Sequence, residues 1–307
     1  MTQKLHNRAI GYFDAVRRYG SIREAARRLD IAASAVNRHI LTLEADVGMP
    51  LFDRRNNGMV LTAAGEVLAR HAVAVLQDER RATEELRALM GLRRGDLSLM
   101  AVESLGVSFL PDLVERMAAR HPGIKIKAGL AGSDAVAAAV ADGDTDIGLG
   151  FSLPRHSELE RVAEGRFKIR AVMRPDHPLA GRERLSFSDC AQYALIMPRA
   201  DLSLHELITP LLRRHRGMVE VVAEASSLVL MKQLTLRTGA ICFQTRLALE
   251  EELKDGRLVA VPLQSGGPIV TDLGVFVRAG RSLPGSVSAF LALAGEALAQ
   301  IATEEGV

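Results

Sequence analysis

Six polar side chains close to the N-terminus have the types and the spacing that suit contacts with DNA. They are Ser21, Ser34, Asn37, Arg38, Arg54 and Arg55. Arg can form a bidentate pair with guanine and Asn with adenine, whereas Ser reaches either a base or a phosphate. Arg54 and Arg55 precede a turn-forming Asn-Asn-Gly at 56–58, where arginines can hold the phosphate backbone or enter the minor groove. The chemistry that these residues predict is noncovalent recognition of double-stranded DNA.

Two short helices are expected to position these side chains. Ser21 and Glu24 have the spacing of a capping box, in which each side chain satisfies a free amide of the other, so a helix should begin there. Residues 30–32 break the pattern, and a second helix opens at residue 33 or 34. Its apolar residues recur in steps of four and three; they are Val36, Ile40, Leu43 and Val47.

The opposite face of the second helix has the composition of a recognition helix, which offers its N-terminal side chains to base edges. It presents Ser34, Asn37, Arg38 and Leu41. A helix at 7–19 supplies Ile10, Phe13 and Val16 for a three-helix core, and residues 52–62 are expected to form a small β wing around the turn. The same hairpin also fits an ordinary polar helix surface, because short motifs of this kind occur in proteins that bind no DNA.

This stretch resembles the DNA-binding domain of the LysR-type transcriptional regulators. The family's Leu-Glu pair, Gly, Leu-Phe-x-Arg and Leu-Thr-x-x-Gly are matched at residues 43–44, 48, 51–54 and 61–65. Where many members carry Ser before the recognition-helix Arg, this chain has Asn37, so the preferred bases do not follow from the family. The resemblance implies a winged helix-turn-helix domain over residues 1–62 that binds double-stranded DNA.

One long helix should follow, from residue 62 to about residue 90. Apolar or small residues step by four and three along it, which is the pattern of a weak coiled-coil seam; the positions are Leu68, Ala72, Val75, Glu79, Ala82, Leu86 and Leu89. The segment 63–90 is similar to the linker helix through which LysR-type proteins pair, so a homodimer or a homotetramer is implied. An amphipathic helix packed on its own subunit would show the same period.

From residue 95 onward strands and helices alternate, which predicts a parallel sheet covered by helices. We expect strands at 97–102, 124–130, 147–151, 167–173, 193–197, 219–223, 240–243 and 272–277 and helices at 107–120, 133–141, 204–215, 227–238 and 284–303. The fold class is therefore α/β multidomain. The layout resembles the two-lobed, periplasmic-binding-protein-like effector domain of the family, with lobe I at 91–164 and 268–307 and lobe II at 165–267.

Several side chains near the predicted strand ends could bind an effector, because ligands settle outside the carboxyl ends of strands in open α/β sheets. The candidates are Ser104, Ser133, Phe151, Ser203, Ser226, Ser227 and Phe243. Helix N-termini at these places favour a carboxylate or another small anion, so we expect a small-molecule, anionic effector. The serines could instead cap their helices, and the phenylalanines could pack in a core.

Metal and redox sites find little support in the sequence. Asp142, Asp144 and Asp146 alternate like the start of a calcium loop, but Ile147 and Leu153 stand where that loop needs Gly and Glu. The run of acids at 250–252 suits a solvated helix face. Cys190 and Cys242 have no zinc-site spacing; a redox-sensing pair is the alternative to two small buried hydrophobes. We therefore expect no metal, no cofactor and no catalytic residue.

Composition and charge agree with a globular chain that carries a basic N-terminal module. Residues 1–62 hold ten Lys or Arg and six Asp or Glu, a net charge of +4, and the rest of the 307 residues carries −2. A positive module on a slightly negative body suits a DNA-binding domain joined to a domain with another role. The sequence lacks a signal-peptide pattern and any run near the ~18 apolar residues of a membrane span, so a cytoplasmic location without a membrane partner is expected.

These patterns predict a sequence-specific DNA-binding transcriptional regulator of the LysR type, controlled by an effector bound between two C-terminal lobes. The alternative is a two-lobed small-molecule-binding protein or an enzyme whose N-terminal helices serve only assembly. No GxSxG, HExxH or P-loop motif occurs in the sequence, which weighs against an enzyme. RNA polymerase is an open further partner. The target genes, the direction of regulation and the effector do not follow from the sequence.

Overall fold

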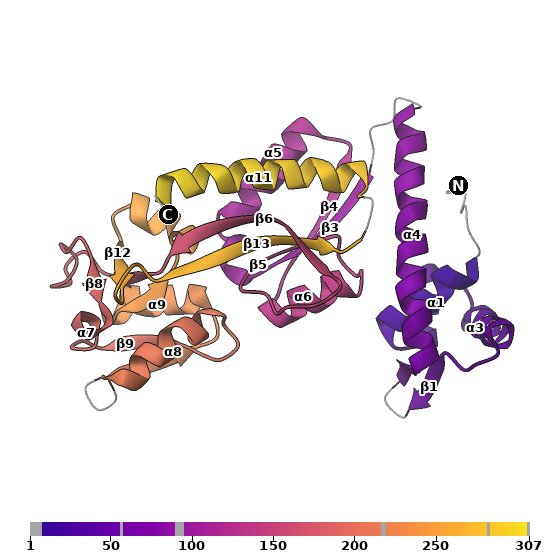
Figure 1. Cartoon of the computed structure of the whole chain (residues 1–307), viewed down its shortest axis with the longest axis horizontal. Helices are drawn as coiled ribbons and strands as arrows, with labels where there is room; N and C mark the ends of the chain where they lie inside the picture. Colours follow the sequence, from indigo (N-terminus) through magenta and orange to yellow (C-terminus); the bar gives the residue numbers. More distant parts are fainter. Residues whose placement is uncertain (1–7, 56–57, 90–94, 216–218, 281–282, 306–307) are drawn as a thin grey trace. The chain divides into compact units, whose positions relative to one another are not determined.

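The computed structural model describes residues 8–55, 58–89, 95–215, 219–280 and 283–305. Its chain divides into two compact units, one formed by residues 1–95 with 142–144 and 281–285 and the other by the remaining residues. We call residues 8–89 the head and the second unit the effector unit. Figure 1 labels the helices and strands of both.

The head is a winged helix-turn-helix domain, as the sequence predicted. Its elements are α1 (Arg8–Tyr19), α2 (Ile22–Leu29), α3 (Ala33–Val47), β1 (Phe52–Arg55), β2 (Gly58–Leu61) and α4 (Ala63–Leu89). Phe13, Val16, Val36, Ile40 and Leu51 are buried in one core beneath the three short helices. The strands β1 and β2 pair antiparallel and form the wing.

The family motif of the head fastens the wing to its neighbouring helices. The carboxylate of Glu44 accepts hydrogen bonds from the amides of Leu51 at 2.8 Å and Phe52 at 3.3 Å. Thr62 Oγ1 donates to the Pro50 carbonyl at 2.7 Å and accepts from the Gly65 amide at 3.0 Å. A Cβ at Gly65 would overlap the carbonyl oxygen of Leu51. Glu44, Thr62 and Gly65 of the family motif are therefore needed for packing the head.

Helix α4 belongs to the head in its first half. Ala69 and Ala72 are buried in the core of the head, whereas Leu86 is 53% exposed. An exposed Leu on the expected seam suits a helix that meets a second copy. Pairing through α4 stays a prediction.

The first lobe of the effector unit is a five-stranded sheet in the order β4-β3-β5-β13-β6. The strands are β3 (Gly95–Ala101), β4 (Ile124–Leu130), β5 (Ile147–Phe151), β6 (Leu159–Lys168) and β13 (Val270–Arg278). Strand β3 runs parallel to β5, but β13 is antiparallel to both β5 and β6. The sheet is thus mixed, whereas the alternation of strands and helices predicted a parallel one.

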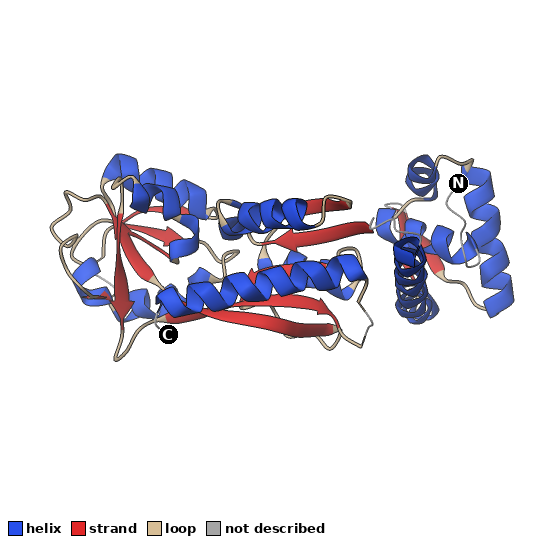
Figure 2. Cartoon of the chain, turned by 90° about the horizontal axis from the view of Figure 1, so that it is seen from above, coloured by secondary structure: helices blue, strands red, loops and turns tan. Residues whose placement is uncertain are grey.

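Helices cover both faces of this sheet. They are α5 (Phe109–Arg120), which follows the 3-10 turn η1 (Glu103–Gly106), α6 (Ser133–Ala141) and α11 (Gly285–Glu305). Figure 1 shows α11 on one face and α6 on the other, and Figure 2 shows α11 lying along the strands. Leu298 of α11 packs near Gly165 of β6, and Val136 and Val140 of α6 pack near Gly148 of β5.

The single strand predicted at 167–173 is the end of one strand and the whole of the next. Residues 159–168 form β6, which pairs with β13 along its length, and β7 (Arg170–Met173) belongs to another sheet. Polar residues occupy most outward positions of β6 and hid its strand pattern, since only Ala163, Gly165 and Phe167 alternate clearly inward. The chain therefore leaves the first lobe after Lys168, later than the crossing expected near 164.

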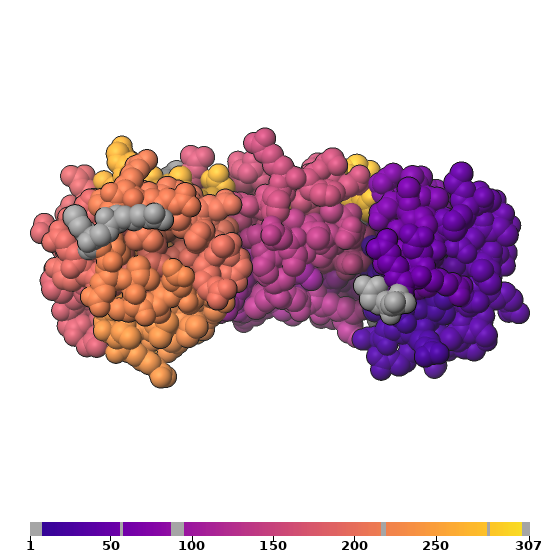
Figure 3. Space-filling view, turned by 90° about the horizontal axis from the view of Figure 1, so that it is seen from below, coloured from indigo at the N-terminus to yellow at the C-terminus, as the bar shows by residue number. Residues whose placement is uncertain are grey.

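The second lobe contains a four-stranded sheet in the order β11-β7-β12-β8 and a parallel pair, β9 and β10. Its strands are β7, β8 (Leu185–Ser186), β9 (Leu195–Pro198), β10 (Val221–Ala225), β11 (Cys242–Gln244) and β12 (Val259–Gln264), and its helical segments are α7 (Phe187–Cys190), α8 (Leu204–Arg214), α9 (Leu228–Thr238), η2 (Arg246–Ala248) and α10 (Glu250–Lys254). Sequence patterns missed β8, β12 and α7, which are short or interrupted by proline. Figure 3 shows this lobe, in pink and orange, directly beside the magenta first lobe.

Helix α11 is apolar enough to match a membrane span by length and composition alone, over Gly285–Ala302 with a mean hydropathy of 1.4. No other helix within the described ranges passes the same test. Phe290, Leu293, Ala294 and Leu298 of α11 are buried. This burial is that of a core helix, because these side chains pack inside the effector unit.

Candidate functional site

The outward face of α3 carries three of the side chains that the sequence singled out for base contacts. Ser34 and Arg38 are exposed, and Asn37 is half-buried. The N-cap residue of α3 is Ala32, which forms no side-chain cap. No side chain therefore caps the start of α3, although the amides of Ala35 and Val36 donate to the Ala32 carbonyl at 3.0 and 3.3 Å. Ser34 lies in this first turn, where a phosphate or a base edge could bind.

The wing is joined to the recognition helix by one side-chain hydrogen bond. Arg54 Nη2 donates to Asn37 Oδ1 at 3.0 Å, and both groups lie at the surface. Arg55 is exposed and lies 3.8 Å from the Asp53 carboxylate, which is a loose surface pair. Arg55 is therefore more available than Arg54 to bind a phosphate, because Arg54 also positions Asn37.

Ser21 caps α2, so its hydroxyl has a structural contact in addition to the DNA contact that the sequence suggested. The Glu24 amide donates to Ser21 Oγ at 3.4 Å. The Glu24 side chain does not complete the expected capping box: it pairs with Arg27 at 2.7 Å and Arg28 at 2.9 Å. Hydrogen bonds from Arg27 and then Arg28 lower the pKa of Glu24 to about 2.

A cavity of about 560 Å³ opens between the two lobes of the effector unit. Its lining comes from both lobes and is mostly apolar with several hydroxyls: Val102, Glu103, Ser104, Leu130, Ala131, Gly132, Ser133, Phe151 and Thr271 from the first, and Ile169, Asp201, Leu202, Ser203, Leu204, Leu207, Ser226, Leu228, Gln244 and Thr245 from the second. Its size suits a small molecule. Ends of β3, β5 and β11 and starts of α6, α8 and α9 meet there.

Five of the seven residues proposed from the sequence line this cavity: Ser104, Ser133, Phe151, Ser203 and Ser226. Ser227 and Phe243 are not among its lining residues. Ser227 caps α9, because its Oγ accepts from the Leu230 amide at 3.1 Å. Phe243 is fully buried and stacks on Phe187 in the core of the second lobe. These two residues thus follow the capping and packing alternatives.

Sequence reasoning missed Glu103, which reaches across the cavity. Its Oε1 accepts from Ser227 Oγ at 2.8 Å and its Oε2 from the Leu228 amide at 3.1 Å. Glu103 belongs to η1 of the first lobe, and both donors lie at the start of α9 in the second lobe. The carboxylate therefore occupies the N-terminus of α9 and joins the lobes. Only its acidic character after a strand end could have marked it in the sequence.

Gln244, at the end of β11, has one satisfied and one unsatisfied side-chain group. Its Nε2 donates to the Leu228 carbonyl at 2.8 Å, which fixes the orientation of the amide because a carbonyl only accepts. Its Oε1 is buried and has no partner among the described residues. An unsatisfied buried acceptor costs about 1 to 3 kcal/mol.

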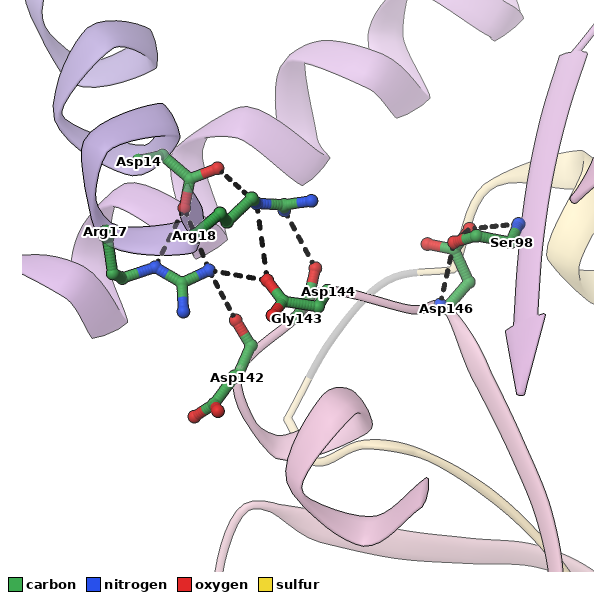
Figure 4. A network of polar contacts seen from close by, with 8 residues as sticks. All are labelled: Asp14, Arg17, Arg18, Ser98, Asp142, Gly143, Asp144 and Asp146. Atoms are coloured by element: carbon green, nitrogen blue, oxygen red, sulfur yellow. Dashed lines mark hydrogen bonds and ion pairs between the residues drawn. The ribbon is translucent and has the colours of Figure 1, made fainter. Parts of the chain in front are cut away.

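Asp146, one of the acidic residues that imitated a calcium loop, has a structural partner. The carboxylate of Asp146 accepts from the Ser98 amide at 2.9 Å and from Ser98 Oγ at 2.8 Å, as Figure 4 shows. In the head, Asp14 accepts from Arg17 Nε at 3.0 Å and Arg18 Nε at 2.7 Å (Figure 4). Within the described part of the chain, no group of three or more His, Cys, Asp or Glu side chains could hold a metal ion.

Both cysteines are buried free thiols in the second lobe. Burial raises the pKa of Cys190 to about 12 and that of Cys242 to about 11. A redox-sensing thiol needs thiolate character and access to solvent. The geometry therefore favours the packing alternative for both residues.

Comparisons with known proteins match the two units separately. Residues 7–66 match the family model described as the bacterial regulatory helix-turn-helix protein, lysR family, and residues 90–299 match the LysR substrate binding domain. The HTH-type transcriptional regulator CbbR of Rhodospirillum rubrum is 28% identical over 94% of this chain and 95% of its own length. CbbR of Rhizobium meliloti is 30% identical over 82% of this chain and 80% of its own.

A solved structure shows the same fold over almost the whole chain. Full-length OxyR from Pseudomonas aeruginosa superposes with a TM-score of 0.75 at 15% identity, covering 94% of this chain and 93% of that chain. At this identity the likeness concerns the fold alone. It supports the order of a winged helix-turn-helix domain, a long helix and a two-lobed α/β domain.

Proposed function

Because this chain belongs to the LysR family of transcriptional regulators and carries both the DNA-binding and the effector-binding domain of that family, we propose how each of its two units works. The head binds DNA by inserting α3 into the major groove, and the effector unit binds a small molecule in its cavity. The observation that carries the second part is the cavity of about 560 Å³ lined from both lobes.

On DNA, Arg38, Asn37 and Ser34 contact base edges, and Arg54 and Arg55 contact phosphates beside the groove. The support is geometric: Ser34 and Arg38 are exposed on the same face of α3, and both wing arginines are exposed. The bond from Arg54 to Asn37 couples the wing to the reading face. Ser21 also contacts the DNA, from the start of α2, where Glu24 pairs with Arg27 and Arg28.

In the cavity, the effector contacts Ser104, Ser133, Phe151, Ser203 and Ser226. It regulates the protein by binding one arrangement of the lobes better than another, because a ligand shifts an equilibrium only by its differential affinity. Glu103 is the side chain best placed to sense this, since it bridges the lobes at the rim of the cavity. The anionic effector expected from the sequence is one form of this proposal.

We expect a homodimer or homotetramer that pairs through α4, which would place two recognition helices on half-sites about one DNA turn apart. The exposed Leu86 on the expected seam supports this arrangement. RNA polymerase is a further partner in this proposal, and we assign none of the described residues to that contact.

Footprinting tests the proposal directly. The purified chain is incubated with the DNA upstream of its own gene and of the divergent neighbour at two salt concentrations. We expect protection of two half-sites separated by one or a few helical turns, weakening steeply with salt because the contacts release counterions. The control is the Arg38→Ala variant, which should lose sequence-specific protection first. Equal protection of all DNA sequences would contradict the proposal. So would the absence of any protection, even after fractions of cellular small molecules are added.

A further inference from the structure

The charged residues of the cavity are all acidic. Glu103 and Asp201 line it, and none of its described lining residues is a lysine, arginine or histidine. The other polar lining groups are neutral: hydroxyls, one amide and backbone groups. An anion entering this partly open space would meet like charge without a side-chain countercharge from the described lining.

The helix N-termini around the cavity already have negative partners. The carboxylate of Glu103 accepts from Leu228 and Ser227 at the start of α9. Helix α6 carries Asp134 in its first turn and α8 carries Glu206 in its first turn. Each helix dipole is therefore complemented by a carboxylate of the protein, so a ligand gains little by bringing another.

A lining residue of the cavity holds a buried, unsatisfied acceptor. Gln244 is 1% exposed, lines the cavity and holds Oε1 without a partner among the described residues. Its Nε2 is fixed on the Leu228 carbonyl, and the amide of the same Leu228 is held by Glu103. Oε1 has less than 1 Å² of accessible surface, so a ligand that displaced the atoms covering it and donated a hydrogen bond to it would remove the cost of the buried acceptor.

We propose that the cavity selects a neutral or cationic effector with hydrogen-bond donors, such as an amide or an amine, and that Glu103 excludes anions by occupying the anion position at α9. This inference rests on the proposed function for the site and names its ligand class. Glu103 determines specificity in two ways: its charge repels anionic ligands, and its bonds to α9 hold the lobes around ligands of the other class.

Three probes of equal chain length test the charge of the ligand: succinate as a dianion, succinamide as a neutral diamide and 1,4-diaminobutane as a dication. Binding to the full chain is measured by ligand-observed saturation-transfer NMR and by calorimetry. The cavity-filling variant Ala131→Trp shows which signals come from the cavity, and Ser226→Trp on the opposite wall replaces it if that chain does not fold. Glu103→Gln removes the charge at nearly constant size, and the matched control Glu183→Gln removes an exposed charge outside the lining.

The wild-type chain should bind succinamide or 1,4-diaminobutane, but not succinate, with signals that the cavity-filling variant abolishes. Glu103→Gln should weaken the diamine and strengthen succinate, each by about tenfold or more, because it removes one of the two charges of the cavity lining. Glu183→Gln should leave all three unchanged. Gln244→Leu should weaken succinamide without strengthening succinate.

Preferred binding of succinate by the wild-type chain would overturn the proposal, and so would cavity-independent signals from all three probes. Equal affinities in Glu103→Gln and the wild type would remove Glu103 from it. If Glu103→Gln does not fold, the wild-type ranking alone decides. These outcomes are independent of DNA: cavity-dependent binding of the diamine with no footprint would leave this inference intact while the proposed mode of DNA binding fails.

Discussion

On the head, the arginines expected to contact DNA lie exposed at the surface, whereas in the effector unit Glu103 and Gln244 of the cavity lining are bonded to the start of α9. Arg38 of α3 and Arg55 of the wing are both exposed. Glu103, by contrast, accepts hydrogen bonds from the start of α9 with both of its carboxylate oxygens. The difference follows from the partners: a long polyanion attracts exposed cations from outside, but a small effector must compete with bonds that the cavity already holds.

The largest expected effect concerns the packing that supports the exposed face. Gly65→Ala places a Cβ against the Leu51 carbonyl, which is backbone and cannot turn away. We expect the head to lose roughly 3 kcal/mol of unfolding free energy and the protein to lose DNA binding, while the effector unit melts as before. Differential scanning calorimetry with separate head and effector transitions measures both.

The matched control for Gly65→Ala is Gly295→Ala in α11, where an added Cβ meets nothing within 4 Å. It should be neutral or slightly stabilising, because Ala favours a helix more than Gly does. A Gly65→Ala chain that binds DNA normally would break the link between this glycine and the recognition face.

Base reading is the next test of the contrast. Arg38→Ala should cost about 1 to 3 kcal/mol at a specific site and much less on unrelated DNA, if Arg38 forms a bidentate base contact. Fluorescence anisotropy on specific and scrambled duplexes gives the two values. Arg237→Ala, an exposed arginine of α9, serves as the control and should change neither. Equal losses on both duplexes would show that Arg38 contacts the backbone instead.

The wing arginines should have smaller and more uniform effects. Arg55→Ala should weaken binding to all sequences alike and lower the slope of log affinity against log salt by about 1. Arg54→Ala should do the same and also reduce specificity, because it releases Asn37. A salt titration of each variant distinguishes them. Identical specificity in the two variants would mean that the bond from Arg54 to Asn37 has no part in reading DNA.

The smallest effect is expected at the enclosed thiols. Burial raises the pKa of Cys190 to about 12 and of Cys242 to about 11, so almost no thiolate exists near neutral pH. Iodoacetamide should leave both residues unmodified in the native chain and alkylate both in urea, as mass spectrometry would show. Rapid alkylation of either cysteine in the native chain would instead support a redox-sensing role for that thiol.

The two regions also differ in how far sequence could predict them. The helices of the head depend on residues close together in the chain, such as Val36 and Ile40 on α3, so a period of 3.6 was enough to predict them. The contacts of Asn37 and Arg38 with bases stay a prediction. The cavity joins segments more than a hundred residues apart, for example Glu103 and Ser227. Serines at helix starts marked its neighbourhood, but spacing alone could not distinguish Ser226 in the lining from Ser227 in a cap.

Strand β6 was missed for a related reason. Most of its exposed side chains are polar, and two of its inward residues, Ala163 and Gly165, are small, so it lacked the apolar alternation that marks a half-buried strand. What defines β6 is its partner β13, a strand that lies a hundred residues later and pairs with it from Leu159 to Lys168. Pairing between distant segments is invisible to local patterns, and the mixed direction of the sheet was hidden with it.

The pairing of β6 with β13 also suggests how such a chain could arise. Lys168 and Val270 are direct partners, and beyond them the Ile169 amide donates to the Ile269 carbonyl at 2.8 Å. The second lobe thus enters and leaves through two neighbouring points on one hairpin. A short turn could close that hairpin in its place, which makes residues 169–269 an insertion in the architecture of the first lobe.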